Sequence, residues 1–198
     1  MENKTIQPGG KGIFREYIEA ILVALIAALL IRTFVAQAFR IPSGSMIPTL
    51  LVGDQLLVDK VAYHFRSPAR GDIIVFKYPG DENRDFIKRI IGLPGDTVEV
   101  RARAVYINGA PLNEPYAWHD ALDDMRIVPR DDFGPVTVPP DKYFMMGDNR
   151  ENSQDSRFWG FLERDKIIGR AFVLYWSRDG EHIFPFGIRW ARFGLLIG

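Results

Sequence analysis

The chain has 198 residues, and its 25 lysine and arginine side chains are balanced by 25 aspartate and glutamate side chains. The formal net charge at pH 7 is therefore zero, which gives no support to nucleic-acid binding. The chain contains no cysteine, which excludes a disulfide framework, a thiolate zinc site and a cysteine nucleophile. Its length suits one compact domain with an additional terminal segment.

An uninterrupted run of twelve apolar residues, Ala20 to Ile31, lies near the N-terminus inside a longer and mostly apolar segment. A helix that spans a bilayer needs about 20 mostly apolar residues, so the inner run alone is short. Glu19 and Arg32 flank the run, and their long side chains can reach opposite membrane interfaces. We therefore predict a short tail at residues 1–16 and one retained membrane anchor at residues 17–38.

Two other interpretations of this segment stay open. One is a buried core helix, although a run without a polar face beside a charged tail does not favour it. The other is a cleavable signal peptide, because Ala36-Gln37-Ala38 matches an A-x-A cleavage site after an apolar region. Cleavage after Ala38 would leave Ser45 seven residues from the new N-terminus. We expect Arg32 and a helix that continues toward Ser45 to keep this bond out of an extended conformation.

After Leu50 the chain is predicted to be mostly β. Short segments rich in β-branched and aromatic residues alternate with turn residues, a pattern typical of strands. Asn108-Gly109 is a strong signal for a hairpin turn. The predicted strands are residues 55–61, 72–78, 85–91, 97–100, 105–107, 142–146 and 167–176. We expect a β-rich domain of folded-over antiparallel β-sheets over residues 39–198.

Two segments of this domain fit the pattern less well. Residues 110–140 contain several prolines and are interpreted as a surface insertion. The acidic side chains of this insertion are interpreted as a solvated face and not as a metal site: Asp120, Asp123, Asp124, Asp131 and Asp132. Residues 184–198 interleave aromatic, arginine and aliphatic side chains, which is typical of a membrane interface. Packing of this last segment on the β core is an equally good interpretation.

A serine lies in an unusual turn directly after the apolar segment, in Phe39-Arg40-Ile41-Pro42-Ser43-Gly44-Ser45-Met46-Ile47-Pro48-Thr49-Leu50. Pro42 and Gly44 favour a turn, and Pro48 prevents a regular helix through it. Such a bend can present the Ser45 hydroxyl and nearby backbone amides to a substrate carbonyl. The alternative is a polar linker after the anchor, and the apolar residues after Ser45 argue against it.

A serine hydroxyl is a poor nucleophile until a base takes its proton. The three histidines, His64, His119 and His182, lie in no motif, but a neutral lysine can replace histidine. Lys88 lies in the stretch Asp85-Phe86-Ile87-Lys88-Arg89-Ile90-Ile91-Gly92-Leu93-Pro94-Gly95-Asp96.

In a regular strand, Phe86, Lys88 and Ile90 share one face, whereas Asp85 and Arg89 lie on the other. Burial between Phe86 and Ile90 favours the neutral amine. A pKa near 8 in place of about 10.4 corresponds to roughly 3 kcal/mol, which desolvation can supply. An isolated strand lysine is usually a surface residue, so this interpretation depends on the pairing with Ser45.

A third stretch, Gly147-Asp148-Asn149-Arg150-Glu151-Asn152-Ser153-Gln154-Asp155-Ser156-Arg157-Phe158-Trp159-Gly160-Phe161, is dense in short polar side chains. This composition is typical of a hydrogen-bonded loop. It is either a structural turn network or an active-site wall that orients the base.

Together the three stretches resemble bacterial type I signal peptidase, a family of membrane-anchored serine proteases with a Ser/Lys dyad. The serine motif, Arg70-Gly71-Asp72, the Lys88 stretch and the Gly147 loop occur in the order and spacing of that family. The resemblance implies an endopeptidase that removes signal peptides from exported preproteins after Ala-x-Ala-like sites, without a metal or other cofactor. Glu151 departs from the family, which often has aspartate at this position.

The resemblance also implies a location and partners. It places the N-terminal tail in the cytoplasm, the anchor as a single pass through the bacterial cytoplasmic membrane, and the catalytic domain on the extracytoplasmic side. The implied partners are the lipid bilayer and the signal peptides of preproteins. We expect the enzyme to act as a monomer.

By this resemblance, Ser45 is the nucleophile and Lys88 the general base. Ser43 supplies an oxyanion-hole hydroxyl beside the Ser45 N–H. Ser153 matches the residue that orients the lysine. The remaining matches are a supporting ion pair of Asp155 and Arg157, structural roles for Arg70 and Asp72, and shallow apolar substrate pockets formed by Phe39, Ile41, Pro42, Met46, Leu50, Phe86 and Ile87.

Two other functions are possible rivals, and the sequence favours neither. A self-cleaving repressor-type peptidase also uses a Ser/Lys pair, but it needs a DNA-binding domain where this chain has an apolar segment. A non-catalytic anchored β module that binds extended segments would be indicated by loss of Ser45 or Lys88, and both residues are present.

Overall fold

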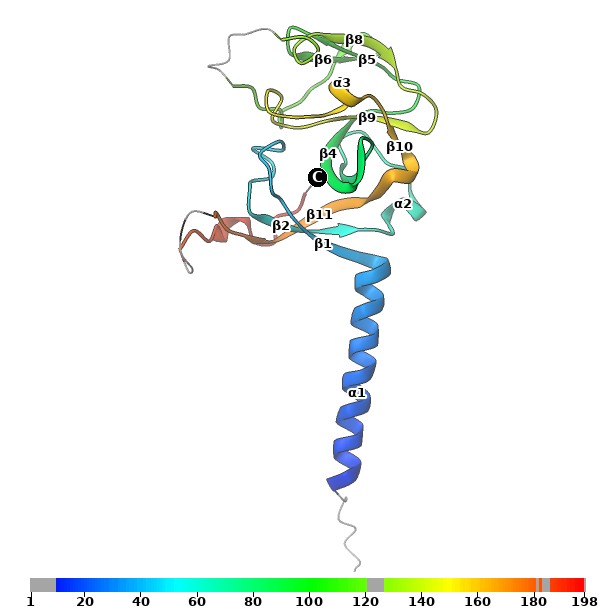
Figure 1. Ribbon diagram of the computed structural model, residues 1–198, viewed down its shortest axis with the longest axis vertical. Coiled ribbons are helices and arrows are strands. Elements are labelled where there is room, and N and C mark those ends of the chain that lie inside the picture. Colours follow the sequence, from blue (N-terminus) through cyan, green and yellow to red (C-terminus); the bar gives the residue numbers. More distant parts are fainter. Residues whose placement is uncertain (1–9, 121–126, 181, 183–185, 198) are drawn as a thin grey trace, which may run out of the picture.

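A long N-terminal helix projects from a β-rich body in the computed structural model, which describes residues 10–120, 127–180, 182 and 186–197 (Figure 1). The helix α1 (Gly10–Leu30) continues as a π-helical segment η1 (Ile31–Val35). The range Phe14–Val35 is long and apolar enough to cross a membrane, and its most apolar window is not buried against the body. A buried core helix is therefore excluded.

The helix ends before the predicted limit of the anchor. Strand β1 (Ala36–Arg40) begins directly after η1, so residues 36–38 belong to the sheet. β1 pairs antiparallel with β2 (Asp54–Asp59). The expectation that the helix continues toward Ser45 is thus wrong, and the bond after Ala38 lies in an extended strand. Lys60, just after β2, donates from Nζ to the carbonyl of Thr33 over 2.6 Å and ties the helix end to the sheet.

The body consists of two antiparallel sheets, as predicted (Figure 1). The seven-stranded sheet has the order β1-β2-β11-β3-β4-β9-β10 and the four-stranded sheet the order β7-β6-β5-β8. The remaining strands are β3 (Ile73–Tyr78), β4 (Asp81–Gly92), β5 (Thr97–Arg101), β6 (Ala104–Ile107), β7 (Ala110–Pro111), β8 (Phe133–Thr137), β9 (Lys142–Met146), β10 (Leu162–Glu163) and β11 (Ile167–Ser177). Short helical segments are α2 (Ala62–Phe65), α3 (Ser156–Trp159), η2 (Arg164–Lys166) and η3 (Trp190–Arg192).

Each predicted strand coincides with an observed one. The long strand β4 lies near the middle of the larger sheet and contributes to all three hydrophobic clusters. Ile87 packs into the cluster beneath β1, β2 and β11, Ile90 into a second cluster, and Ile91 into a third between the sheets. This packing fixes the register of the strand that carries Lys88.

The segment 110–140 is not only a surface insertion. Its strand β8 pairs with β5 and completes the smaller sheet. Asp131 is 1% exposed, and its carboxylate accepts hydrogen bonds from Arg130 and from the Ile127 N–H. The prediction of a solvated acidic face is therefore wrong for Asp131, while Asp123 and Asp124 lie outside the described residues.

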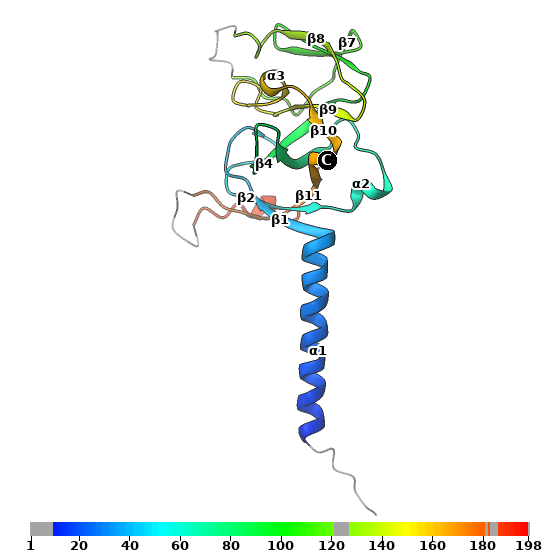
Figure 2. The same ribbon diagram turned by 45° about the vertical axis from the view of Figure 1, so that its right-hand side comes forward.

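The described part of the C-terminal segment packs on the body through its arginines. Arg192 donates to the Asp54 carboxylate over 2.6 Å and to the Thr49 carbonyl over 2.8 Å. In contrast, Trp190 is 68% exposed and Leu196 is 78% exposed. Figures 1 and 2 both place η3, near the red end of the chain, at the level of β1 and β2. The interpretation that the segment packs on the body is confirmed for Arg192, whereas contact of the exposed side chains with a membrane stays a prediction.

Candidate active site

The hydroxyl of Ser45 and the amine of Lys88 are in direct contact. Lys88 Nζ lies 2.7 Å from Ser45 Oγ and donates a second hydrogen bond to the Ile87 carbonyl over 3.0 Å. Ser45 is 8% exposed and Lys88 is 4% exposed. The turn after β1 supplies the serine and β4 supplies the lysine. Two residues that are distant in the sequence thus form a buried hydroxyl–amine pair.

Burial brings the pKa of the Lys88 amine closer to neutral pH. Desolvation lowers the pKa of Lys88 to about 8, against the smaller opposing effects of the Asp155 and Asp148 carboxylates. The amine lies 5.4 Å from the centroid of the Phe86 ring, and the Asp85 carboxylate instead pairs with Lys77 over 2.8 Å. The predicted direction and cause of this pKa shift are therefore confirmed.

The turn that carries Ser45 packs on the hydrophobic core, and the Ser45 N–H has no hydrogen-bond partner among the described residues. Met46 and Leu50 are fully buried in the core, and the Leu50 N–H donates to the Met46 carbonyl over 2.9 Å. Among the described residues, none accepts a hydrogen bond from the Ser45 N–H. Ser43 is exposed one residue before Gly44. The nucleophile turn thus offers a backbone donor close to the hydroxyl.

A cleft of about 540 Å³ opens onto the pair. The residues that line it are Pro42, Ser43, Gly44, Ser45, Arg84, Asp85, Phe86, Ile87, Lys88, Asn152 and Gln154. Three of the predicted pocket residues, Pro42, Phe86 and Ile87, are among them. The structure instead places Ile41, Met46 and Leu50 in the hydrophobic core, with Phe39 packed against it.

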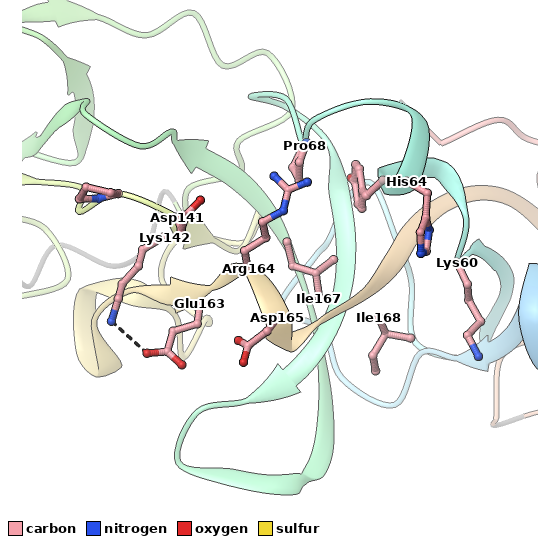
Figure 3. A pocket seen from close by; sticks show the side chains of 12 residues that line it. Lys60, His64, Pro68, Asp141, Lys142, Glu163, Arg164, Asp165, Ile167 and Ile168 are labelled. Atoms are coloured by element: carbon pink, nitrogen blue, oxygen red, sulfur yellow. Dashed lines mark hydrogen bonds and ion pairs between the residues drawn. The ribbon is translucent and has the colours of Figure 1, made fainter.

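A larger hollow, of about 740 Å³, lies elsewhere, around α2, β10 and η2 (Figure 3). Lys60, His64, Glu163 and Arg164 are among its lining residues, and Lys142 pairs with Glu163 over 3.0 Å. Neither Ser45 nor Lys88 lines it. The hydroxyl–amine chemistry therefore belongs to the smaller cleft.

The three histidines lie outside the cleft. His64 lines the hollow of Figure 3. His119 Nδ1 is 2.9 Å from a carboxylate oxygen of Glu151, and His182 Nδ1 is 3.0 Å from one of Asp179. None of them contacts Ser45, which leaves Lys88 as the base in hydrogen-bonding contact with the hydroxyl.

Ser153 lies near the pair but makes no bond to it in this structure. Its Oγ is buried and has no hydrogen-bond partner among the described residues. A side chain at Gly147 would collide with both Ser153 Oγ and the Ser45 carbonyl, which shows how tightly the two serines pack around this glycine. The predicted role of Ser153 in orienting Lys88 stays a prediction.

The predicted supporting residues all form ion pairs, and one of these pairs was predicted. Asp155 and Arg157 form a buried pair over 2.9 Å, and Asp155 also accepts a hydrogen bond from the Gly147 N–H over 3.1 Å. Arg70 and Asp72 have separate partners. Arg70 pairs with Asp96 over 3.0 Å, whereas the Asp72 carboxylate accepts from Tyr63, Arg66 and Arg170.

Sequence reasoning missed the polar contacts between the Gly147 loop and the nucleophile turn. Arg89 donates to both oxygens of Asp148, over 2.8 and 2.7 Å, and Thr49 Oγ1 donates to the same carboxylate over 2.6 Å. Asn149 donates to the carbonyls of Gly44 and Ser45. The available signal was Arg89, a charge within a largely apolar strand, because a buried charge needs a partner.

The sequence is similar to those of known signal peptidases. A family model described as "Signal peptidase, peptidase S26" matches residues 14–176. A signal peptidase I of Leptolyngbya laminosa is 48% identical over 185 residues, which cover 88% of this chain and 87% of that protein. A probable signal peptidase I-1 of Synechocystis is 44% identical over 196 residues, which cover 93% and 95%. A crystal structure of a signal peptidase I from Enterococcus faecalis is 35% identical, with a TM-score of 0.44, and covers 53% of this chain and 97% of that one.

Proposed function

Because the chain belongs to the signal peptidase family, peptidase S26, and is a serine peptidase of the signal peptidase I type, we propose that Ser45 and Lys88 form its catalytic dyad. The substrates are preproteins whose signal peptides are cleaved after Ala-x-Ala-like sites. The observation that supports this assignment is the 2.7 Å contact between a buried hydroxyl and a buried amine whose pKa is lowered.

The geometry supports a two-step acyl transfer. Ser45 Oγ attacks the scissile carbonyl carbon while its proton moves to the neutral Lys88 amine. The tetrahedral intermediate collapses when the Lys88 ammonium gives this proton to the leaving amine, and the peptide C–N bond breaks. Lys88 then accepts a proton from a water molecule that attacks the acyl-enzyme ester, and Ser45 is regenerated.

The negative charge of the tetrahedral intermediate needs donors that are already in place. The Ser45 N–H is free of partners among the described residues, and the Ser43 side chain lines the same cleft. We assign these two groups to the oxyanion hole. Around them, Pro42, Phe86 and Ile87 give the cleft an apolar wall suited to small side chains.

An extended substrate fits the strand edge beside the dyad. β4 pairs with β9 from Arg89 to Gly92, so the preceding residues of β4 are unpaired on that side. Residues 84–88 line the cleft. A peptide added along this edge would gain backbone hydrogen bonds and bring its scissile bond to Ser45.

The membrane arrangement is part of the same proposal. The exposed apolar helix spans the cytoplasmic membrane once, with the tail in the cytoplasm and the catalytic domain outside. Trp190 and Leu196, both exposed in the C-terminal segment, lie at the lipid interface, where aromatic residues are enriched. The anchor confines the enzyme, acting as a monomer, and its membrane-inserted substrate to one plane, which raises their effective concentration.

Product sequencing tests this function. The full chain, purified in detergent, is incubated with a preprotein, and the new N-terminus of the product is sequenced. We expect cleavage directly after the Ala-x-Ala site. A protein that binds the preprotein without cleaving it would instead be the non-catalytic binding module.

A further inference from the structure

Asn149 is bonded to two consecutive carbonyl groups of the nucleophile turn. Its Nδ2 donates to the Gly44 carbonyl over 3.1 Å, and its backbone N–H donates to the Ser45 carbonyl over 3.1 Å. The Asn152 N–H donates to Asn149 Oδ1 over 3.3 Å, which fits the assignment of the amide nitrogen to the side that faces Gly44. The Gly44 carbonyl also accepts a hydrogen bond from the Ile47 N–H over 3.2 Å, so Asn149 is its side-chain donor and Ile47 its backbone donor.

These contacts determine where the Ser45 N–H points. The peptide between Gly44 and Ser45 is planar and trans, so its C=O and N–H groups point to opposite sides of the chain. Because the Gly44 carbonyl points toward Asn149, the Ser45 N–H points away from it. Both Gly44 and Ser45 line the cleft, and no described residue accepts a hydrogen bond from this N–H.

Hydrogen bonds of the neighbouring residues fix the backbone around Asn149. Its two neighbours bond to one residue of another segment: the Trp118 N–H donates to the Asp148 carbonyl over 2.7 Å, and the Arg150 N–H donates to the Trp118 carbonyl over 3.1 Å. The Asp148 carboxylate in turn accepts from Thr49, within the nucleophile turn. The loop and the turn are thus joined at several points, and Asn149 is buried between them.

We propose that Asn149 is a positioning residue for the oxyanion hole, because its hold on the Gly44 carbonyl aims the Ser45 N–H at the developing oxyanion. The inference rests on the proposed role of Ser45 as the nucleophile. Asn149 does not line the cleft. Its loss therefore weakens transition-state stabilisation and leaves ground-state substrate binding unchanged.

Asn149→Asp tests this role with the smallest change of shape. The carboxylate keeps an acceptor for the Asn152 N–H but has no donor for the Gly44 carbonyl. Outright removal of an oxyanion donor costs about 10²–10³ in kcat, so we expect a fall of roughly 10- to 100-fold for a misaimed donor, with KM unchanged. The rates are compared on the pH plateau, where Lys88 is neutral even if the new carboxylate raises its pKa.

A peptide aldehyde provides a readout that a purely structural role would not move. Ser45 adds to the aldehyde as a hemiacetal, whose oxygen occupies the position of the oxyanion. In Asn149→Asp the inhibition constant should rise by the same factor by which kcat/KM falls. Substrate affinity, measured in Ser45→Ala with and without Asn149→Asp, should not change.

Asn149→Ala is the second variant and Asn108→Ala the matched control. Asn108 Oδ1 accepts a hydrogen bond from the Thr97 N–H in a distant turn, so its loss lowers the melting temperature without lowering kcat. The proposal would be overturned if both Asn149 variants had wild-type kcat, or if KM rose while kcat did not fall. An unchanged inhibition constant of the aldehyde, or variants too unstable to assay, would also overturn it. An active Ser45→Ala would instead refute the proposed nucleophile.

Discussion

Arg89 and Asp148 form a buried, two-point ion pair, with Nε to Oδ1 at 2.8 Å and Nη2 to Oδ2 at 2.7 Å. Arg89 follows Lys88 in β4, and Asp148 precedes Asn149 in the loop that is bonded to the nucleophile turn. The pair therefore joins the strand of the base to the loop that holds the nucleophile. Its geometry is important because a misplaced reacting group lowers the rate of catalysis.

Removal of one partner should be strongly destabilising. Arg89→Met leaves the Asp148 carboxylate buried with Thr49 as its remaining side-chain partner, and an uncompensated buried charge costs about 3–5 kcal/mol. We expect this loss in the free energy of unfolding, measured by denaturant titration of the detergent-solubilised chain. Lys142→Met, which breaks the exposed pair with Glu163, is the control and should cost about 0–1 kcal/mol. Equal losses in the two variants would contradict the structural role of the buried pair.

Alanine substitutions test the dyad. Ser45→Ala and Lys88→Ala should each abolish cleavage without loss of the fold, because the two residues act as a unit and their effects do not add. Ser43→Ala should keep measurable activity, since the backbone donor remains and loss of one donor costs about 10²–10³ in rate. The measurement is single-turnover cleavage of a preprotein, with circular dichroism as the check on folding. An active Lys88→Ala enzyme would refute the assignment of the base.

Gly147 packs tightly against Ser153 and the Ser45 carbonyl. An alanine there would collide with Ser153 Oγ and with the Ser45 carbonyl, which is backbone and cannot rotate away. Overpacking typically costs about 1–3 kcal/mol, and here it would also displace the nucleophile turn. We expect Gly147→Ala to lose most of its kcat. Gly180→Ala, where an added methyl group meets no atom within 4 Å, is the control and should behave as wild type.

Self-cleavage after Ala38 is testable by intact mass. The bond lies in β1, whose backbone is already paired with β2, so it is not available as a separate extended segment for the cleft. We expect the membrane-extracted protein to be intact. A main species that begins at Phe39 would show that β1 leaves the sheet and would overturn the retained anchor.

The strands were predictable because their signals are local, whereas the pairing of Ser45 with Lys88, 43 positions apart, was implied by the family resemblance. The period of two along β4 placed Lys88 beside Phe86, and the burial of the strand explains the lowered pKa of the amine. The residue at which the helix ends was not predictable, since Thr33 and Phe34 are compatible with both helix and strand. The pairing of β1 with β2 determines where the strand begins. The contact between Arg89 and Asp148 joins residues 59 positions apart, and only the tertiary fold brings such charges together.

Of the predicted pocket residues, Pro42, Phe86 and Ile87 line the cleft, whereas the others do not. Met46 and Leu50 are assigned to the substrate pockets because they match positions of the family, and this assignment stays a prediction. In the structure both are fully buried in the core beneath the turn. Their apolar character serves to hold the turn, and the sequence pattern does not distinguish this role from a binding pocket.

The pH dependence of kcat/KM tests the identity of the base most directly. In the proposed mechanism the free enzyme is active only when Lys88 is neutral, and burial lowers the pKa of this amine to about 8. The rate should therefore rise with pH through an ascending limb near pH 8 and reach a plateau above it. Substitution of His64, His119 and His182 together should leave the limb in place. A limb near pH 6.5 that disappears with a histidine, or one near 10.4, would contradict a buried lysine base.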